Sequence, residues 1–438
     1  MNVRVHASTV AGTVAAPASK SAMIRAVAAA LLATGRTVIR NPSRCDDARA
    51  ALTVARALGA RVAVRRDRVT VTGGLTLAGT PLDCGESGLA ARLFPAIAAL
   101  GASEVTITGR GSLLHRPVGP IEHPLRQLGA ECASTNGHLP LRVRGPLRGG
   151  QAVVDGALTS QFLTGLLMAL PLAPRDSVLS VCGLASRPYI DLTLAVMRSF
   201  GVTVVHEGYG EFRIPGNQRY RPAEYDVEGD WSGAAFLLVA GAAAGDIAVT
   251  GLDPASTQAD RRVMDALAAA GAAPEWQAVA KDPPTIERVR TTRAALQAFE
   301  IDLSDAPDLF PPLVALAVHA RGRSVLGGAG RLAHKESDRA SALVRMFAAL
   351  GGDVRRDGDA LVVAGGGGLA GGTVDAGGDH RMAMAAAVAA LGAAGPVTIR
   401  GAQCVRKSYP DFFGDLASLG AVTGSAVHRD NKSRRTAD

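Results

Sequence analysis

Lysine is almost absent from this basic chain of 438 residues. Lysine and arginine together number 47, and only five are lysine, so arginine is the ordinary surface cation. A retained lysine marks a place that needs a compact, rotatable ammonium rather than a planar fork. Chance placement is one explanation for the positions of the five lysines. The other is a site for a polyanionic small molecule, because three of them lie in polar runs at or just before a helical pattern. The three runs are Ser19-Lys20-Ser21, Lys335-Glu336-Ser337-Asp338-Arg339 and Arg406-Lys407-Ser408.

Cysteine and aromatic residues are also scarce. The five cysteines form no Cys-x-x-Cys pair and the nine histidines no His-x-x-x-His pair, so we expect neither a disulfide framework nor a structural metal site. Free cysteines suit a reducing compartment, so we expect the protein in the cytoplasm. Aromatic residues make up 4% of the chain and do not interleave with basic stretches, as base stacking requires. The formal charge of +8 therefore favours small acidic ligands over nucleic acid.

Long apolar runs are missing as well. The apolar stretch 26–33 is too short to span a membrane, and it follows Pro17, Ser19 and Lys20, so we expect a buried helix rather than a signal peptide. Residues 425–438 are polar and basic and are expected to form a flexible tail. Nothing in the pattern suggests a subunit interface, so we expect a monomer.

A sixfold repeat organises the chain. A stretch of helical pattern ends in glycine six times, with 69 to 80 residues between successive glycines. Each glycine suits the position just after a helix, where the backbone turns left-handed. A period of this length is too long for the common solenoids. The repeated glycines are Gly59, Gly129, Gly201, Gly271, Gly351 and Gly420.

Each repeat also contains an earlier helix that is apolar on every side, which predicts that it is buried. The later helices, such as 188–200, are amphipathic. Each unit is therefore predicted to run strand, buried helix, strand, outer helix and two strands, and six units imply two domains of three. We expect domains at 18–226 and at 1–17 with 227–424. The predicted buried helices are 21–33, 88–100, 160–172, 232–244, 308–320 and 380–392.

Polar residues stand at the start of every predicted buried helix. Such residues are ordinary N-caps when taken singly. Several helix N-termini that converge on one cleft would instead form a strong anion site, because each offers free N–H groups and a positive dipole end. The six starts are Ser19–Ser21, Gly85–Gly88, Thr159–Gln161, Gly229–Ser232, Asp305–Asp308 and Gly378–Arg381.

These motifs resemble those of the enolpyruvyl transferases, and specifically the branch that uses shikimate 3-phosphate. The matching stretches run from Ser19 to Phe413. The resemblance implies an α/β fold of two domains, each of three βαβαββ units around buried helices (an inside-out α/β barrel), with the site in the interdomain cleft. It implies transfer of the enolpyruvyl group from phosphoenolpyruvate to the 5-hydroxyl of shikimate 3-phosphate, through a tetrahedral intermediate, in aromatic amino-acid biosynthesis. No metal or organic cofactor is expected.

The resemblance also implies roles for individual residues. Asp308 would accept the proton of the acceptor hydroxyl, Glu336 would protonate the methylene of phosphoenolpyruvate, and Lys20 would contact both substrates. The residues expected to bind shikimate 3-phosphate are Lys20, Ser21, Arg25, Thr159, Ser160, Gln161, Ser186, Asp308 and Lys335. Those expected to bind phosphoenolpyruvate are Lys20, Gly88, Arg116, Gln161, Arg339, Arg381 and Lys407.

The residue types agree with this chemistry. Two phosphorylated substrates require several cations, and one carboxylate must take a proton while another gives one. Lys335 and Arg339 should lower the pKa of Glu336. We expect burial on domain closure, or a proton passed through Lys20, to offset that effect. We also expect the cleft to lie open between two mutually repelling cationic faces and to close when anions bind.

Several positions depart from the family pattern. Ala18, Glu86, Leu89 and Leu93 replace residues common in the family, and Leu89 and Leu93 lead us to expect reduced sensitivity to glyphosate. Other acceptors stay open, among them a modified shikimate or UDP-N-acetylglucosamine, although the loop 109–116 lacks the cysteine of the latter branch.

Two further alternatives are disfavoured. A dinucleotide-binding oxidoreductase that uses 365–372 would need a helix after the glycines, and the strand-like Thr373-Val374-Asp375 follows instead. A non-catalytic repeat scaffold that binds anions does not account for the paired acid–base candidates.

Overall fold

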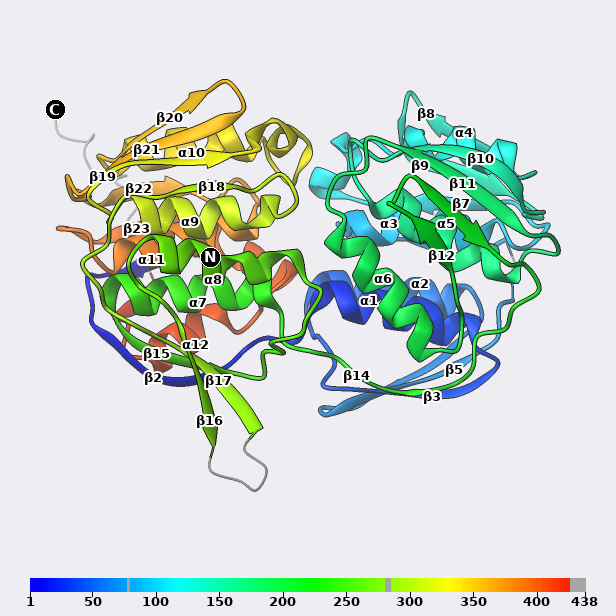
Figure 1. Ribbon diagram of the computed structural model, residues 1–438, viewed down its shortest axis with the longest axis horizontal. Helices are drawn as coiled ribbons and strands as arrows, with labels where there is room; N and C mark the ends of the chain where they lie inside the picture. The colour runs from blue at the N-terminus through cyan, green and yellow to red at the C-terminus, as the bar shows by residue number, and fades with distance from the viewer. Residues whose placement is uncertain (77–78, 280–284, 426–438) are drawn as a thin grey trace, which may run out of the picture.

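Two separate hydrophobic cores divide the molecule. The computed structural model describes residues 1–76, 79–279 and 285–425. Buried side chains between Ala22 and Val227 form the core of the first lobe, and those at 3–10 and 231–421 form the core of the second. The lobes lie side by side in Figure 1. The tail expected at 425–438 lies outside the described residues, apart from Ser425.

The first lobe contains helices and strands in regular alternation. Its elements are α1 (Lys20–Leu32), β3 (Gly35–Arg40), α2 (Asp46–Ala57), β4 (Arg61–Val64), β5 (Arg68–Gly73), β6 (Leu82–Asp83), α3 (Gly88–Ala98), β7 (Val105–Thr108), α4 (Glu122–Gln127), β8 (Glu131–Thr135), β9 (His138–Arg144), β10 (Gly150–Asp155), α5 (Gln161–Ala169), β11 (Ser177–Cys182), α6 (Pro188–Ser199), β12 (Val205–Glu207), β13 (Glu211–Ile214) and β14 (Glu224–Asp226).

The second lobe repeats the same alternation and includes the first two strands of the chain. Its elements are β1 (Val3–Val5), β2 (Val10–Ala15), α7 (Trp231–Ala244), β15 (Gly245–Thr250), α8 (Val263–Ala269), β16 (Glu275–Val279), β17 (Thr285–Thr292), β18 (Glu300–Asp302), α9 (Phe310–Ala317), β19 (Gly322–Gly327), α10 (Arg339–Ala349), β20 (Asp353–Asp357), β21 (Ala360–Gly365), β22 (Gly372–Asp375), α11 (His380–Ala390), β23 (Val397–Arg400), α12 (Phe412–Ser418) and β24 (Thr423–Ser425).

Six four-stranded sheets, three in each lobe, contain the named strands of the described residues. In the sheet β10-β11-β13-β12, β10 pairs parallel with β11, and the other two pairs are antiparallel. Two units take their first strand from a distant part of the chain, because β2 pairs with β15 and β14 pairs with β3. The expected α/β fold of two sets of three βαβαββ units is confirmed.

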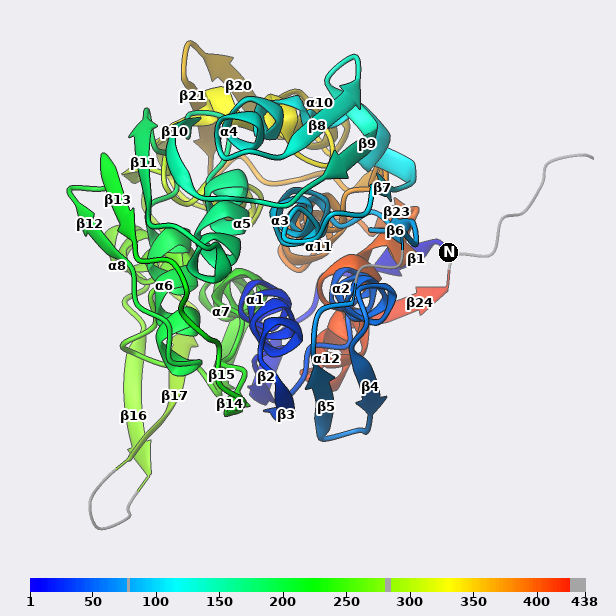
Figure 2. The ribbon, with the colours of Figure 1, turned by 90° about the vertical axis from the view of Figure 1, so that its right-hand side faces the viewer.

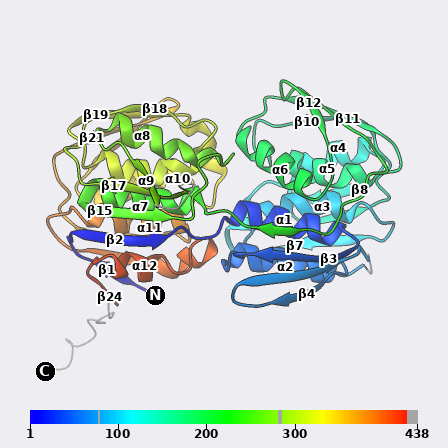
Figure 3. The same cartoon turned by 60° about the horizontal axis from the view of Figure 1, so that its bottom comes forward.

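Two segments connect the lobes, and both pass through the same place. Residues 16–19 lead from β2 into α1, and 227–230 lead from β14 into α7. An isolated antiparallel bridge joins Ala18 to Gly229, so the two crossings run side by side (Figure 3). The N-termini of α1 and α7 therefore begin next to each other at the boundary between the lobes.

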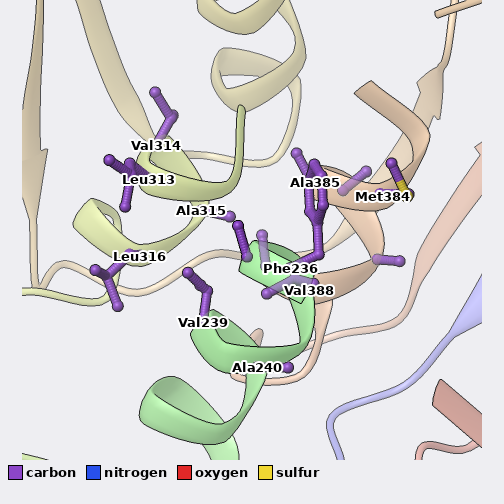
Figure 4. Close-up of a cluster of buried hydrophobic side chains, with 14 of the residues drawn as sticks. Phe236, Val239, Ala240, Leu313, Val314, Ala315, Leu316, Met384, Ala385 and Val388 are labelled. Carbon is purple, nitrogen blue, oxygen red and sulfur yellow. The ribbon is translucent and has the colours of Figure 1, made fainter. Parts of the chain in front are cut away.

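The apolar helices are buried, as their composition predicts. In the first lobe, α1, α3 and α5 are buried, and Figure 2 shows α1 and α3 end-on inside the lobe. In the second lobe, α7, α9 and α11 pack through side chains such as Phe236, Leu316 and Val388 (Figure 4). The helix predicted at 308–320 begins as a 3-10 turn at Pro307–Leu309, so α9 starts only at Phe310.

All six repeated glycines adopt the left-handed backbone that their position predicts. Each directly follows the C-cap residue of an outer helix, where a residue with a Cβ would be strained. The repeat found in the sequence is therefore a structural repeat. The φ angles are 105° at Gly59, 94° at Gly129, 79° at Gly201, 84° at Gly271, 84° at Gly351 and 101° at Gly420.

The glycine-rich stretch 365–372 joins two strands. Gly365 ends β21 and Gly372 begins β22. A dinucleotide fingerprint requires the glycines to open a helix whose N-terminus receives the pyrophosphate. The dinucleotide-binding alternative is therefore wrong. In the described ranges no helix is both long and apolar enough to cross a bilayer.

Candidate active site

The N-terminal ends of the buried helices face one cavity between the lobes. Fourteen of the fifteen predicted site residues line it, and Lys407 lies on the wall of a neighbouring cavity, where its Nζ is 4.0 Å from Glu336 Oε1. The fold thus brings together residues almost 400 positions apart, from Lys20 to Lys407. The fourteen are Lys20, Ser21, Arg25, Gly88, Arg116, Thr159, Ser160, Gln161, Ser186, Asp308, Lys335, Glu336, Arg339 and Arg381.

The start of α1 supplies two cations from the first lobe. Ser19 caps the helix by accepting a hydrogen bond from the Ala22 amide, which places Lys20 at the mouth of the helix. The Lys20 ammonium lies 3.1 Å from Asp47 Oδ2. Burial opposes the charge on Lys20, but the carboxylates of Asp47 and Glu336 together outweigh burial and raise the pKa of the ammonium. Lys20 therefore stays cationic at neutral pH.

Arg25 lies one turn further along α1 and is held by neutral groups. Its Nε donates to Thr193 Oγ1 at 2.8 Å, and its Nη1 donates to the Ser21 carbonyl at 2.9 Å. Burial lowers its pKa to about 10, which still leaves it charged at neutral pH. No ion pair to Arg25 occurs in the part of the chain that the structure describes, so its charge is available to an anionic ligand.

Arg339 organises the acidic groups of the second lobe. It is 1% exposed, and its guanidinium contacts three carboxylates: Asp308 at 2.6 Å, Glu336 at 2.7 Å and Asp379 at 2.8 Å. A planar fork with five donors can hold three acceptors at once, which an ammonium cannot do in this geometry. The two candidate acid–base groups, Asp308 and Glu336, are therefore fixed by one shared cation.

Two more cations hold Asp308 from other directions. Arg381 lies 3.1 Å from Asp308 Oδ2, and Lys335 lies 3.3 Å from Oδ1. Arg381 comes from the start of α11, where Asp379 caps the helix through the Arg381 amide. The starts of α10 and α11, which carry Arg339 and Arg381, and the loop before α10, which carries Lys335, therefore converge on the Asp308 carboxylate.

The lobes meet directly at the cavity. Arg116 Nη1 from the first lobe lies 3.4 Å from Glu336 Oε1, and Arg331 Nη1 from the second lobe donates to Ser186 Oγ at 2.8 Å. Asp305 Oδ1 accepts a 2.7 Å hydrogen bond from the Ser186 amide. Ser186 has a φ of 58°, an unusual angle for a residue with a side chain. The expectation of two repelling cationic faces is wrong, because carboxylates of the second lobe neutralise the cations that they meet.

Both candidate acid–base carboxylates are held in the ionised form. Burial raises the pKa of Asp308, but Arg381, Lys335 and Arg339 outweigh it and hold that pKa well below its usual range. Burial likewise opposes ionisation of Glu336, and Arg339 and Arg116 overcome it. The expectation that burial offsets these cations at Glu336 is wrong, since the side chain is already 9% exposed and its pKa is still lowered.

Comparison with known proteins gives a consistent result over the whole chain. Residues 5–416 match the family described as EPSP synthase (3-phosphoshikimate 1-carboxyvinyltransferase). The chain belongs to the EPSP synthase family. A 3-phosphoshikimate 1-carboxyvinyltransferase of Aeropyrum pernix is 42% identical over 419 residues, covering 96% of both chains. One of Methanocorpusculum labreanum is 40% identical over 428 residues, covering 96% of this chain and 99% of the relative.

Solved structures agree with this assignment. An EPSP synthase from Acinetobacter baumannii matches with a TM-score of 0.82 at 26% identity, covering 97% of this chain and all of the other. The two-lobed arrangement of βαβαββ units is therefore that of an EPSP synthase. The non-catalytic scaffold reading loses its basis, because the chain matches enzymes over nearly its full length.

Some residues at this EPSP synthase site were not predicted from the sequence. Asp47 pairs with Lys20, and Arg92 donates to Gln161 Oε1 at 2.9 Å and to the Pro117 carbonyl. Asp260 is 1% exposed, and burial together with the charge of Asp308 raises its pKa to about 6. Arg92 has a local signal, since it is a lone cation in the apolar helix α3; the other two lie in ordinary amphipathic surroundings.

The residues that depart from the family pattern differ in whether they line the cavity. Leu89 lines the cavity, whereas Leu93 is fully buried inside the first lobe and lies outside the cavity wall. Ala18 belongs to the crossing segment. Reduced glyphosate sensitivity stays a prediction, and Leu89 is the residue through which it would act directly.

Proposed function

We propose that this chain transfers the enolpyruvyl group of phosphoenolpyruvate to the 5-hydroxyl of shikimate 3-phosphate and releases phosphate. The observation that carries the proposal is the pair Asp308 and Glu336, which share Arg339 and face cations from both lobes. Membership of the EPSP synthase family supports it over the full length of the chain. The geometry suits one carboxylate that takes a proton and another that gives one.

We assign the acceptor to the side of the cavity formed by α1, α5 and the loop before α6. Ser21, Arg25, Thr159, Ser160 and Ser186 would hold the phosphate of shikimate 3-phosphate, because hydroxyls and one buried guanidinium suit a dianion. Lys335 and Asp308 would contact its hydroxyl groups. The acceptor thus binds to the first lobe, and the second lobe supplies the base.

We assign phosphoenolpyruvate to the point where the lobes meet. Arg116, Arg339, Arg381, Lys407 and Lys20 would bind its carboxylate and phosphate, and the start of α3 at Gly88 offers free amides. A Cβ at Gly88 would lie 2.5 Å from Arg116 Nη1, so only glycine leaves room for that guanidinium. Gln161 would bridge the two substrates.

The chemistry then needs two proton transfers in the addition step and two in the elimination step. The acceptor oxygen bonds to C2 of phosphoenolpyruvate while its proton passes to Asp308, and Glu336 delivers a proton to C3, giving a tetrahedral centre. The C2–O bond to phosphate then breaks, Glu336 takes a proton back from C3 as the double bond is restored, and the leaving phosphate takes up the proton held by Asp308. Substrate anions that take up Arg116, Arg339 and Arg381 would raise the pKa of both carboxylates, since these cations then share their charge. Lys20 would pass a proton to Glu336 before that carboxyl protonates C3.

We also propose the assembly in which this happens. Residues 18–226 and residues 1–17 with 227–424 would be the two domains, since the two crossings run side by side at Ala18 and Gly229. The protein would be a monomer in a reducing cytoplasm, where its five cysteines stay free. We expect no metal or organic cofactor to be needed. Size-exclusion chromatography with light scattering tests the monomer.

A phosphate-release assay with each component omitted in turn tests the proposed activity. Release that requires both phosphoenolpyruvate and shikimate 3-phosphate supports it. Shikimate and UDP-N-acetylglucosamine serve as alternative acceptors in parallel reactions. Release with either alternative and none with shikimate 3-phosphate would move the assignment to another acceptor.

A further inference from the structure

Lys407 is a buried cation without a hydrogen bond. Its side chain is 6% exposed, and its Nζ finds no hydrogen-bond partner in the described part of the chain. Two carboxylates flank it beyond hydrogen-bond distance: Glu86 Oε2 at 3.6 Å and Glu336 Oε1 at 4.0 Å. The ammonium therefore has electrostatic partners but three unused donors.

The two carboxylates differ in freedom. Glu336 is 9% exposed and is also bound by Arg339 and Arg116. Glu86 is 42% exposed, and Lys407 is the only cation within 4.0 Å of its carboxylate among the described residues. A half-exposed side chain with one long ion pair is weakly held. Of the two, only Glu86 can leave Lys407 without breaking a further ion pair among the described residues.

The surroundings of Glu86 allow such a movement. It precedes the Ser87 cap of α3, and its carboxylate lies against Gly111, where an added Cβ would come within 2.5 Å of Glu86 Cδ. Its other side faces a cavity of about 620 Å³, which Lys407 and Arg110 also line. Arg110 pairs with Asp83 at 3.1 Å and is 71% exposed, so a second cation is available in that cavity.

We propose that Glu86 is a displaceable counter-ion of Lys407 that sets the affinity of the site for phosphoenolpyruvate and phosphate. An incoming phosphate group offers more charge than Glu86 and can accept hydrogen bonds from Lys407, so it displaces the carboxylate into the neighbouring cavity. When phosphate is the leaving group, Glu86 returns to Lys407 and favours the release of phosphate. Glu86 thus acts through Lys407 and does not touch the reacting atoms. The inference rests on the proposed assignment of Lys407 to phosphoenolpyruvate.

Glu86→Gln tests this role, because it removes the charge and keeps the shape. We expect KM for phosphoenolpyruvate to fall about two- to fivefold with kcat close to the parent value, and inorganic phosphate to inhibit more strongly by a similar factor. Isothermal calorimetry with inorganic phosphate and shikimate 3-phosphate should show the same tightening without turnover. The difference should shrink as salt is added.

Asp46→Asn is the matched control. Asp46 lines the same cavity and is 52% exposed, but it pairs with Arg49 at 3.6 Å and not with Lys407. It should leave KM and phosphate binding unchanged. An unchanged or raised KM in Glu86→Gln, or an equal fall in Asp46→Asn, overturns the inference. A parent enzyme that releases no phosphate with both substrates overturns the proposed function instead.

Discussion

Among single residues, Glu336 combines a side chain that is only 9% exposed with a pKa held well below its usual range. It contacts Arg339 at the start of α10 and Arg116 of the other lobe, so the same carboxylate would pair with two cations assigned to phosphoenolpyruvate and also donate a proton. These roles are compatible only if the substrates take up the cations first. Substrate binding therefore comes before protonation of Glu336, because it is the charge of the bound anions, and not a movement of the carboxylate, that raises the pKa of Glu336.

Replacing Glu336 with glutamine removes the proton and keeps the volume. We expect kcat to fall by about 10²- to 10⁴-fold, the usual loss when a general acid is removed. Shikimate 3-phosphate should still bind with the parent affinity, since its assigned residues lie elsewhere. Steady-state kinetics and calorimetry measure the two quantities. A variant that keeps most of its kcat would remove Glu336 from the role of acid.

The lowered pKa of Lys335 predicts that activity falls at alkaline pH. Burial lowers its pKa to about 8, despite the opposing charge of Asp308. Above that pH the ammonium loses its proton and its charge, so kcat/KM for shikimate 3-phosphate, which reports the free enzyme, should fall as pH rises. Lys20 does not titrate in this range, because its pKa is raised.

Lys335→Arg distinguishes this cause from others. Arginine keeps its charge far above pH 8, so the alkaline limb should disappear or move upward even if the absolute rate is lower. A limb at the same pH in the variant would assign it to another group.

At the scale of elements, glycines allow the strands to pack against the ends of the buried helices. A Cβ at Gly365 in β21 would lie 2.0 Å from the carbonyl oxygen of Ala317 and 2.3 Å from that of Ala320. Gly73 and Gly145 make equally close approaches in the first lobe, to Ala30 and Ala99. The equivalent contact in these three repeats shows how the buried helices α1, α3 and α9 end against their own sheets.

Gly365→Ala should therefore destabilise the second lobe. Carbonyl oxygens of the backbone cannot rotate away as a side chain can, and we expect the free energy of unfolding to fall by about 1–3 kcal/mol. Gly367→Ala is the control, since nothing lies within 4 Å of a Cβ there. Urea denaturation followed by circular dichroism compares the variants. Equal stability of the two would refute the packing argument.

The elements also show how far the sequence carries the prediction. Apolar helices such as α7 and the repeated glycines are local signals, so the buried layer and the sixfold repeat were predictable. The partners of charged groups were not, because Lys20–Asp47, Arg92–Gln161 and Glu86–Lys407 are brought together by tertiary packing. The neutralised cleft was missed for this reason, since counting cations in each motif does not reveal the carboxylates opposite them.

At the scale of the whole molecule, the described state is closed around its site. Arg116, Arg339 and Lys407 are each below 10% exposed on their side chains. We therefore expect the lobes to separate before both substrates reach these groups. The ion pair between Arg116 and Glu336 and the hydrogen bonds at Ser186 are the contacts that opening must break.

Small-angle X-ray scattering tests this motion. We expect a smaller radius of gyration with shikimate 3-phosphate and phosphoenolpyruvate than without them, because bound anions link the cations of both lobes. Raised salt should expand the ligand-free protein by weakening the ion pair. Identical curves under all conditions would mean that the lobes do not open and close.

Carboxylates and cations of the two lobes are proposed to transfer an enolpyruvyl group to shikimate 3-phosphate. Proton NMR of the complete reaction in deuterium oxide is the sharpest test of this transfer. We expect an enol ether at the 5-oxygen of shikimate 3-phosphate, with deuterium in its methylene because C3 is protonated and then deprotonated. Consumption of phosphoenolpyruvate without that ether, or no consumption while shikimate 3-phosphate is present, would rule the transfer out.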